Sequence, residues 1–235
     1  MKKISILLIT LISSVAMANF GEDLPTQVDV KPNRVYIPKG FDSNDQVQVV
    51  VEGYFPNGCY RPGQAVARVD QEANEIFVST KAYLYSGICI QVIVNYSKVV
   101  DIGLLKEGTY KIYNETDKSL LSEITIESAK VSDPDDFNYA PVNQALLTKT
   151  NNETVLVLTG TFTNSCLSLD EVKASVYKDS VVVQPIVKIS NKNCKEGSFP
   201  YKYNGVVEDM KNPGRYLLHV RSINGKSFNN LVDIN

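Results

Sequence analysis

The sequence predicts an all-β protein that consists of two similar β-sandwich domains in tandem, each closed by one disulfide. Three observations predict this fold class. The halves of the chain share a motif at an offset of 107 residues, both halves are dense in short runs of Val, Ile, Thr and Tyr, and each half carries two of the 4 cysteines. The chain has no sustained 3.6-residue apolar period, which would indicate helices.

The repeated motif determines the number of domains. The stretches 49–59 and 156–166 both consist of three apolar residues, one polar residue and the motif Gly-x-Phe-x-Asn-x-Cys. A later Gly-x-Tyr unit recurs at Tyr110 and Tyr216, at an offset of 106 residues. A period this long indicates a duplicated domain and excludes the short repeats of solenoids.

Each half contains about seven runs with the length of short strands, which is the size of one sandwich domain. We expect strands near residues 27–37, 46–55, 64–69, 75–85, 89–102, 109–113 and 120–126, and then 153–162, 172–177, 181–190, a segment after Cys194, 216–223 and 228–234. The Pro- and Asp-rich stretch 131–141 is predicted to be a linker with the first strand of the second domain. The expected domains are therefore residues 19–130 and 131–235.

The first residues have the pattern of a secretory signal. Lys2 and Lys3 supply positive charge, Ile4–Ile12 is a short apolar run, and Ala16-Met17-Ala18 has the small-x-small pattern of a cleavage site. We expect a signal peptide over residues 1–18 and export to the periplasm or the extracellular medium, and the short Met-Lys-Lys opening is typical of bacteria. No later stretch reaches the ~20 apolar residues of a transmembrane helix, so no membrane span is expected in the mature chain.

The four cysteines are expected to be bridged, because an exported chain meets an oxidising environment. Four cysteines allow three pairings, and only Cys59 with Cys89 and Cys166 with Cys194 respects the duplication. On the chain-entropy account, each bridge stabilises its domain by about 3 to 4 kcal/mol. No free thiol is then left as a nucleophile.

The Gly-x-Phe-x-x-x-Cys opening, the second cysteine and the unit Leu105-x-x-Gly108-x-Tyr110 resemble immunoglobulin-like domains that are common in secreted bacterial proteins. The resemblance covers nearly the whole mature chain and implies no activity. It implies that Tyr110 and Tyr216 form tyrosine corners, in which the hydroxyl turns back onto the backbone. Strand alternation then places His219 on the outer face of its strand.

A second resemblance is to the periplasmic pilus chaperones, which also have a signal peptide and two immunoglobulin-like domains. The segment Arg34-Val35-Tyr36-Ile37 is similar to their first-strand opening. The chain lacks their Pro-Pro-x-x-Arg-Leu-x-Pro motif and their cleft pair of Arg and Lys, and a disulfide in both domains is atypical of them. A periplasmic chaperone-like protein is therefore an alternative interpretation.

No constellation of residues that would support catalysis is apparent, so we expect a protein that is not an enzyme and needs no cofactor. No serine or cysteine nucleophile stands in a recognisable turn near His219. One histidine and four bridged cysteines leave no set of zinc ligands. The formal net charge is −2 and no cluster of Lys and Arg follows Lys3, which disfavours nucleic acid as a partner.

Acidic residues in the linker are candidates for a calcium site. Asp133, Asp135 and Asp136 could supply carboxylate oxygens, but their spacing does not match a calcium loop such as the EF-hand. A solvated linker without metal is the preferred interpretation. The same solvated interpretation is given to Asp42 and Asp45.

The leading hypothesis is a non-catalytic exported binding or structural module that acts through loops or strand edges. Its partner is expected to be a protein or a cell-surface component. The candidate contact residues are Tyr60, Arg61, Tyr83 and Tyr85, because tyrosine and arginine are favoured at interfaces. A second alternative is a secreted hydrolase inhibitor that uses the loop 58–63 beside the first disulfide.

Overall fold

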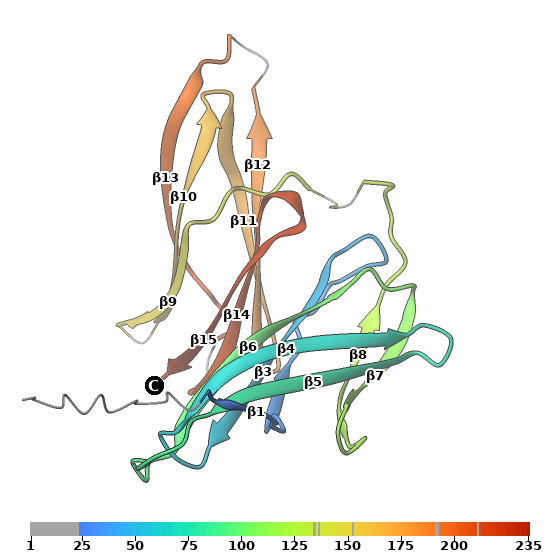
Figure 1. Ribbon diagram of the computed structural model, residues 1–235. Coiled ribbons are helices and arrows are strands. Elements are labelled where there is room, and N and C mark those ends of the chain that lie inside the picture. Colours follow the sequence, from blue (N-terminus) through green and yellow to red (C-terminus); the bar gives the residue numbers. More distant parts are fainter. Residues whose placement is uncertain (1–23, 134, 136, 152, 191–192, 211) are drawn as a thin grey trace, which may run out of the picture.

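The computed structural model describes residues 24–133, 135, 137–151, 153–190, 193–210 and 212–235, and it consists of two β-sandwich domains. Strands β1 to β8 form the first domain and β9 to β15 the second, which stands above the first in Figure 1. The predicted signal peptide, residues 1–18, lies outside the described residues. The all-β, two-domain fold class is thus confirmed, and the structure contains two disulfides.

The first domain has two sheets. The larger sheet has the order β1–β5–β7–β8 with β4 also paired to β5, and the smaller has the order β2–β3–β6. The strands are β1 (Thr26–Asp29), β2 (Arg34–Tyr36), β3 (Val47–Phe55), β4 (Tyr60–Asp70), β5 (Glu75–Leu84), β6 (Val94–Gly103), β7 (Gly108–Asn114) and β8 (Leu120–Ile126).

The second domain repeats this arrangement with sheets β13–β10–β9 and β11–β12–β14–β15. In both domains one pair is parallel, β5 with β7 and β12 with β14, while the other pairs between these strands are antiparallel. The elements are β9 (Gln144–Thr150), β10 (Glu153–Asn164), β11 (Leu167–Tyr177), β12 (Ser180–Ile189), β13 (Glu196–Val206), β14 (Gly214–Arg221), the 3-10 turn η1 (Ile223–Gly225) and β15 (Ser227–Ile234).

Each sandwich encloses its own apolar core. Alternate valines of β3, such as Val49 and Val51, pack with Ile76 of β5 and are fully buried. Leu156 and Leu158 of β10 and Val181 of β12 occupy the equivalent core in the second domain. Period-two alternation of apolar residues along each strand therefore builds both cores.

Three strand predictions differ from the structure. The single strand expected at 27–37 is two short strands in different sheets, because Pro32 has no N–H to continue a ladder. The strand expected from Cys89 starts only at Val94. The first strand of the second domain, expected within residues 131–141, is β9 and lies further along the chain at Gln144–Thr150.

The domains contact each other through the smaller sheet of the first and the larger sheet of the second. Tyr36 of β2, Val50 of β3 and Leu217 of β14 form a buried cluster that spans the two domains. Among the described residues, no helix is long and apolar enough to cross a membrane.

Candidate interaction surface

The repeated Gly-x-Phe motif has one structural role in both domains. Gly53 of β3 pairs with Tyr96 of β6, and a Cβ at this glycine would lie 2.5 Å from the tyrosine ring. Gly160 stands in the same relation to Tyr201, at 2.4 Å. The glycine leaves room for the ring, which stacks on the motif phenylalanine at 4.5 Å in the first domain and 5.0 Å in the second. Glycine within a strand often marks such a close approach.

The Asn-x-Cys part of the motif forms the same turn in both copies. The backbone N–H of Cys59 donates to Oδ1 of Asn57 at 3.0 Å, and the N–H of Cys166 donates to Oδ1 of Asn164 at 3.0 Å. An asparagine side chain closes a turn in this way by imitating the backbone. The motif is therefore a scaffold for the first cysteine of each pair.

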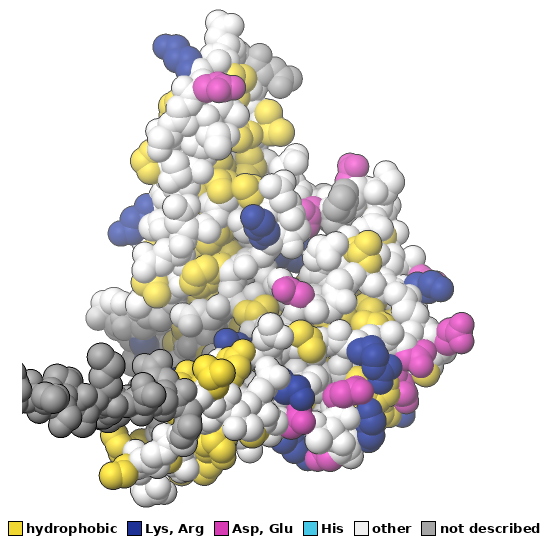
Figure 2. Space-filling view, in the orientation of Figure 1, with side chains coloured by type: hydrophobic (Ala, Val, Ile, Leu, Met, Phe, Trp, Pro, Cys, Tyr) yellow, Lys and Arg dark blue, Asp and Glu magenta, His cyan; other side chains and the backbone are white. Residues whose placement is uncertain are grey.

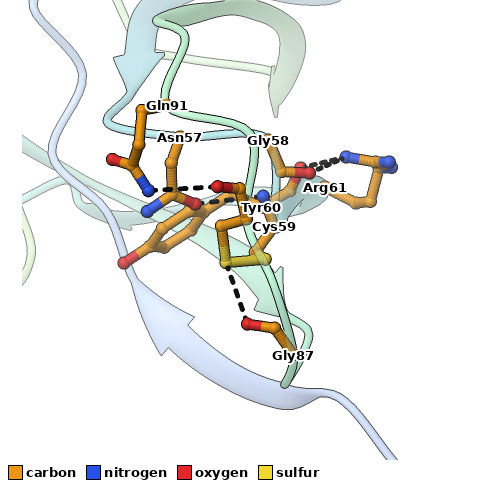
Figure 3. Close-up of a disulfide and its surroundings, with 8 residues drawn as sticks. Asn57, Gly58, Cys59, Tyr60, Arg61, Gly87 and Gln91 are labelled. Atoms are coloured by element: carbon orange, nitrogen blue, oxygen red, sulfur yellow. Dashed lines mark hydrogen bonds between the residues drawn. A yellow bond between two sulfur atoms is a disulfide. The ribbon is translucent and has the colours of Figure 1, made fainter.

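A disulfide joins each of these turns to a later loop. The bridges are Cys59–Cys89 and Cys166–Cys194, with Cα–Cα distances of 5.2 and 5.1 Å (Figure 3 shows the first). We call residues 85–93 the first stapled loop, and the described residues 190 and 193–195 the second stapled loop.

Equivalent backbone hydrogen bonds hold the two stapled loops. In the first domain, Tyr85 N–H donates to the Cys59 carbonyl at 3.0 Å and Gly58 N–H donates to the Ile90 carbonyl at 2.9 Å. In the second domain, the corresponding bonds are Ser190 to Cys166 at 2.8 Å and Ser165 to Lys195 at 2.9 Å. The loops therefore share one frame, and positions 85–90 correspond to 190–195.

The side chains on the two loops are opposite in character. Ile88, Ile90, Val92 and Ile93 are exposed by 104%, 75%, 50% and 70%, respectively. The positions equivalent to Ile88 and Ile90 are Asn193 and Lys195, which are exposed and polar. Figure 2 shows hydrophobic side chains gathered at the lower left end of the molecule, where Figure 1 places the turn between β5 and β6. The first stapled loop is thus an exposed aliphatic surface on a fixed frame.

The structure brings the four predicted contact residues to this end of the domain. Tyr60 pairs with Leu84 and Arg61 with Tyr83, in the register of β4 and β5. The Tyr60 ring stacks on Phe55 at 5.5 Å.

Arg61 and Tyr85 complete this set. The Arg61 guanidinium donates to the carbonyls of Gly58 and Tyr60 at 2.8 Å, while Tyr85 is 45% exposed at the start of the first stapled loop. The sequence prediction missed the aliphatic residues next to them, although the run of isoleucines around Cys89 was a visible signal.

The segment 58–63, proposed as an inhibitor loop, is partly a strand. β4 begins at Tyr60, and Pro62 lies opposite Ala82. A Cβ at Gly63 would lie 2.7 Å from the Lys81 carbonyl, so the segment follows β5 closely. Residues 60–63 of this segment therefore belong to the sheet and do not form a free loop.

The two Gly-x-Tyr tyrosines differ in their hydrogen bonds. The Tyr216 hydroxyl donates to the Asn212 carbonyl at 3.0 Å, which is the bond of a tyrosine corner. The Tyr110 hydroxyl is buried and has no hydrogen-bond partner among the described residues. Its ring is part of the first core, and no such corner bond forms there.

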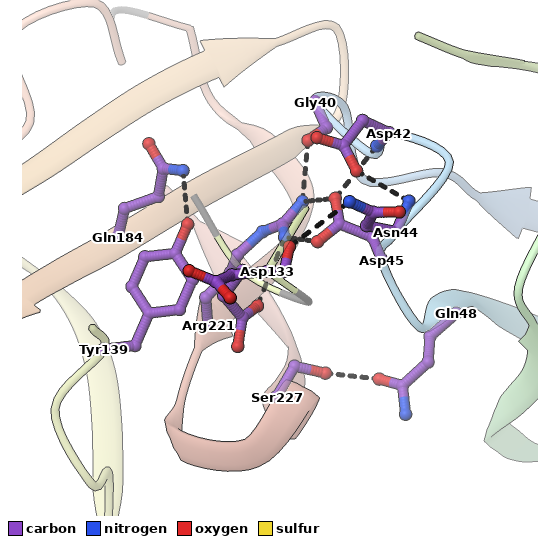
Figure 4. Close-up of polar contacts among 11 residues, drawn as sticks. Gly40, Asp42, Asn44, Asp45, Gln48, Asp133, Tyr139, Gln184, Arg221 and Ser227 are labelled. Carbon is purple, nitrogen blue, oxygen red and sulfur yellow. Dashed lines mark hydrogen bonds and ion pairs between the residues drawn. The ribbon is translucent and has the colours of Figure 1, made fainter. Parts of the chain in front are cut away.

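The two domains are joined by a buried ion pair (Figure 4). Arg221 of β14 binds both carboxylate oxygens of Asp45 and also donates to the Gly40 carbonyl at 2.6 Å. Burial opposes the charge of Arg221, but the bonds and charge of Asp45 outweigh it and raise the arginine pKa. The solvated interpretation of Asp45 is thus wrong, because the second domain covers it.

A second polar contact crosses the same boundary at Glu52. This buried carboxylate accepts from the Tyr36 hydroxyl at 2.9 Å and from Nε of Arg215 at 2.6 Å. Burial, followed by the bond to Glu52, raises the pKa of Tyr36 to about 12. Arg34 pairs with Asp179 of the second domain at 2.7 Å, and the Ile37 carbonyl accepts from the Ser180 hydroxyl at 3.2 Å. The segment 34–37, which resembles the first strand of the pilus chaperones, therefore lies at the interface between the two domains.

His219 also lies at this interface between the two domains. It lies on the outer face of β14, as alternation predicted, but it is only 1% exposed because Phe41 of the first domain packs against it at 5.5 Å. Its Nδ1 is 2.7 Å from Oδ1 of Asn229. Burial lowers the histidine pKa to about 4.

The acidic linker lies next to the buried arginine. Asp135 is 4.0 Å from Arg221, and Asp133 and Asp135 line a pocket of about 770 Å³ between the linker and both domains. Asp136 lies outside the described residues. Within the described ranges, no group of three or more His, Cys, Asp or Glu side chains is arranged to hold a metal ion.

Comparison with known families gives one match. Residues 49–119 are similar to the ORF11 beta-sandwich domain, a stretch that runs from β3 to the turn before β8 and includes the first stapled loop. Comparison with curated proteins and with solved structures gave no match. The family match is compatible with a non-catalytic sandwich domain and specifies no function.

Proposed function

We propose that this protein is an exported, non-catalytic binding module whose contact surface is the first stapled loop. One observation carries the proposal. Four neighbouring aliphatic side chains stand exposed on a loop that a disulfide and two backbone hydrogen bonds hold in place. Single exposed apolar residues are ordinary, but a contiguous exposed patch marks a site of interaction.

The energetics support a contact role for this loop. Moving one aliphatic side chain completely out of water is favourable by roughly 1.5 to 3 kcal/mol of free energy. The disulfide Cys59–Cys89 restricts the conformations of the loop while its aliphatic side chains stand exposed. A loop that is already ordered loses little conformational entropy on binding.

The remainder of the chain supports the loop. The second domain carries the same frame with a polar loop, and the buried pair of Arg221 with Asp45 fixes it against the first domain. Disulfides are maintained in oxidising compartments, which supports export to the periplasm or medium. The partner is a protein or a component of a cell surface.

The proposal is tested with a photo-crosslinking amino acid placed at position 90 and, in a matched variant, at the equivalent position 195. Both positions are exposed and follow a bridged cysteine. We expect an adduct in the producing cells from position 90 and none from position 195. Adducts of equal yield from both positions, or none from position 90, would overturn the proposal.

A further inference from the structure

We infer that the partner of the first stapled loop is the surface of a lipid bilayer, into which the loop inserts its aliphatic side chains. This inference rests on the proposed function, since it names the partner of the same surface. It follows from the chemistry of the loop, its charge and its attachment to the domain.

The loop presents aliphatic side chains of the kind that acyl chains accommodate. Ile88 and Ile90, on either side of Cys89, are 104% and 75% exposed. Anchors of protein interfaces are enriched in Trp, Tyr and Arg, whereas residues 86–93, the aliphatic tip of the loop, contain none of these. Aliphatic chemistry without directional polar groups suits a fluid hydrocarbon interior.

The distribution of charge along the sequence also favours a lipid bilayer as the partner. From Ala82 to Ser97 the sequence contains no Asp, Glu, Lys or Arg, although a lysine stands on either side of this stretch. Lys81 is paired with Asp29, and the Arg61 guanidinium is bound to backbone carbonyls. A charged group is expensive in hydrocarbon, so an uncharged tip with charges set back from it can enter a bilayer.

Tyrosines surround the base of the loop. Tyr85 is 45% exposed and Tyr54 is 52% exposed, and Tyr60 lies beside the disulfide. Tyrosine is enriched at the level of lipid headgroups, where one end of the ring is apolar and the other is wet. The residues next to the loop are therefore of a type that is found at the level of the headgroups.

The expected affinity is modest. The four aliphatic side chains hold about as many carbon atoms as one myristoyl chain, which gives reversible membrane binding with a partition constant on the order of 10⁴ M⁻¹. Uncharged insertion should not depend on salt, because no counterions are released. The loop would hold the protein at a membrane reversibly.

The inference is tested with vesicles of zwitterionic phosphatidylcholine and the disulfide-bonded protein. The chain contains no tryptophan, so Ile90→Trp and the matched Lys195→Trp each introduce a single tryptophan, whose emission can be excited apart from that of the tyrosines. We expect a blue shift on addition of vesicles, and quenching by brominated acyl chains, for Ile90→Trp only. Flotation should show that Ile88→Asn with Ile90→Lys, the residues of the second stapled loop, lowers partitioning at least tenfold, equally at low and high salt. Val66→Ser removes an apolar residue of β4 that is 54% exposed, and it should leave partitioning unchanged.

The outcomes separate this inference from the proposed function. Failure of the unmodified protein to float with vesicles, together with a protein adduct from position 90, would overturn the lipid partner and keep the loop as the contact surface. Partitioning that survives Ile88→Asn with Ile90→Lys, or a blue shift of equal size from position 195, would also overturn the inference.

Discussion

The two stapled loops share a frame and differ in their side chains. Each is held by a disulfide and by the same pair of backbone hydrogen bonds, yet one presents isoleucines where the other presents asparagine and lysine. Scaffold residues recur in both copies because both must fold. The exposed residues are free to differ, and the proposed contact surface lies where the two copies differ.

The strands that carry the Gly-x-Tyr unit show a second difference. The outer face of β7 presents Lys111 and Tyr113, which are exposed or partly exposed. The outer face of β14 presents Leu217, His219 and Arg221, which are all buried. The same strand of the fold is a surface in one copy and a domain boundary in the other.

The largest expected loss of stability comes from breaking the buried ion pair, and breaking an exposed ion pair should cost much less. Arg221→Ala should lower the free energy of unfolding by about 3 to 5 kcal/mol, because it leaves the buried Asp45 carboxylate without its partner. Glu115, at the equivalent place after β7, pairs with Arg68 on the surface at 3.3 Å. Glu115→Ala should lower it by less than about 1 kcal/mol. Urea unfolding measures both, and equal effects would contradict the comparison.

The disulfides should be alike in stability and unlike in function. Their sequence separations are 30 and 28 residues, so removing either bridge by paired Cys→Ser substitution should cost about 3 to 4 kcal/mol. Only the loss of Cys59–Cys89 should reduce binding by the first stapled loop, since only that bridge holds the aliphatic tip. Thermal unfolding and vesicle flotation give the two readouts, and a binding defect from loss of Cys166–Cys194 alone would argue against this assignment.

His219 should make the domain boundary sensitive to acid. Its pKa is about 4 in the folded chain, below the ordinary 6.5, because burial disfavours the imidazolium. Below pH 6.5 the unfolded chain binds a proton at this histidine and the folded chain does not. The free energy of unfolding is therefore unaffected above pH 6.5 and falls as the pH decreases towards 4, by on the order of 3 kcal/mol in total. His219→Asn should remove this part of the pH dependence. An unchanged slope between pH 6.5 and 4 in the variant would show that other groups cause it.

The smallest effect concerns the two tyrosine hydroxyls. Tyr216→Phe should lower the free energy of unfolding by about 1 kcal/mol, because it removes the bond to the Asn212 carbonyl. Tyr110→Phe should leave stability unchanged or raise it, since that hydroxyl is buried without a partner among the described residues. A loss at Tyr110 as large as that at Tyr216 would mean that the two corners are equivalent.

Much of the scaffold could be predicted from the repeat. The motif located the first cysteines and the alternation located most strands, because both are local patterns with a fixed period. The exposed loop was missed, since an apolar run after Cys89 has the same composition as a buried strand. Only the start of β6 at Val94 shows that the isoleucines remain outside the sheet.

By itself, the sequence determined the all-β class and the duplication. The first depends on patterns within each half of the chain, and the second on the recurrence of one motif in both halves. The tertiary structure alone decided which outer face is covered. His219 and Asp45 belong to different domains, and alternation cannot tell whether an outward side chain meets water or another domain. Contacts between residues far apart in sequence leave no periodic signal, so the domain boundary and the exposed first stapled loop became visible only in three dimensions.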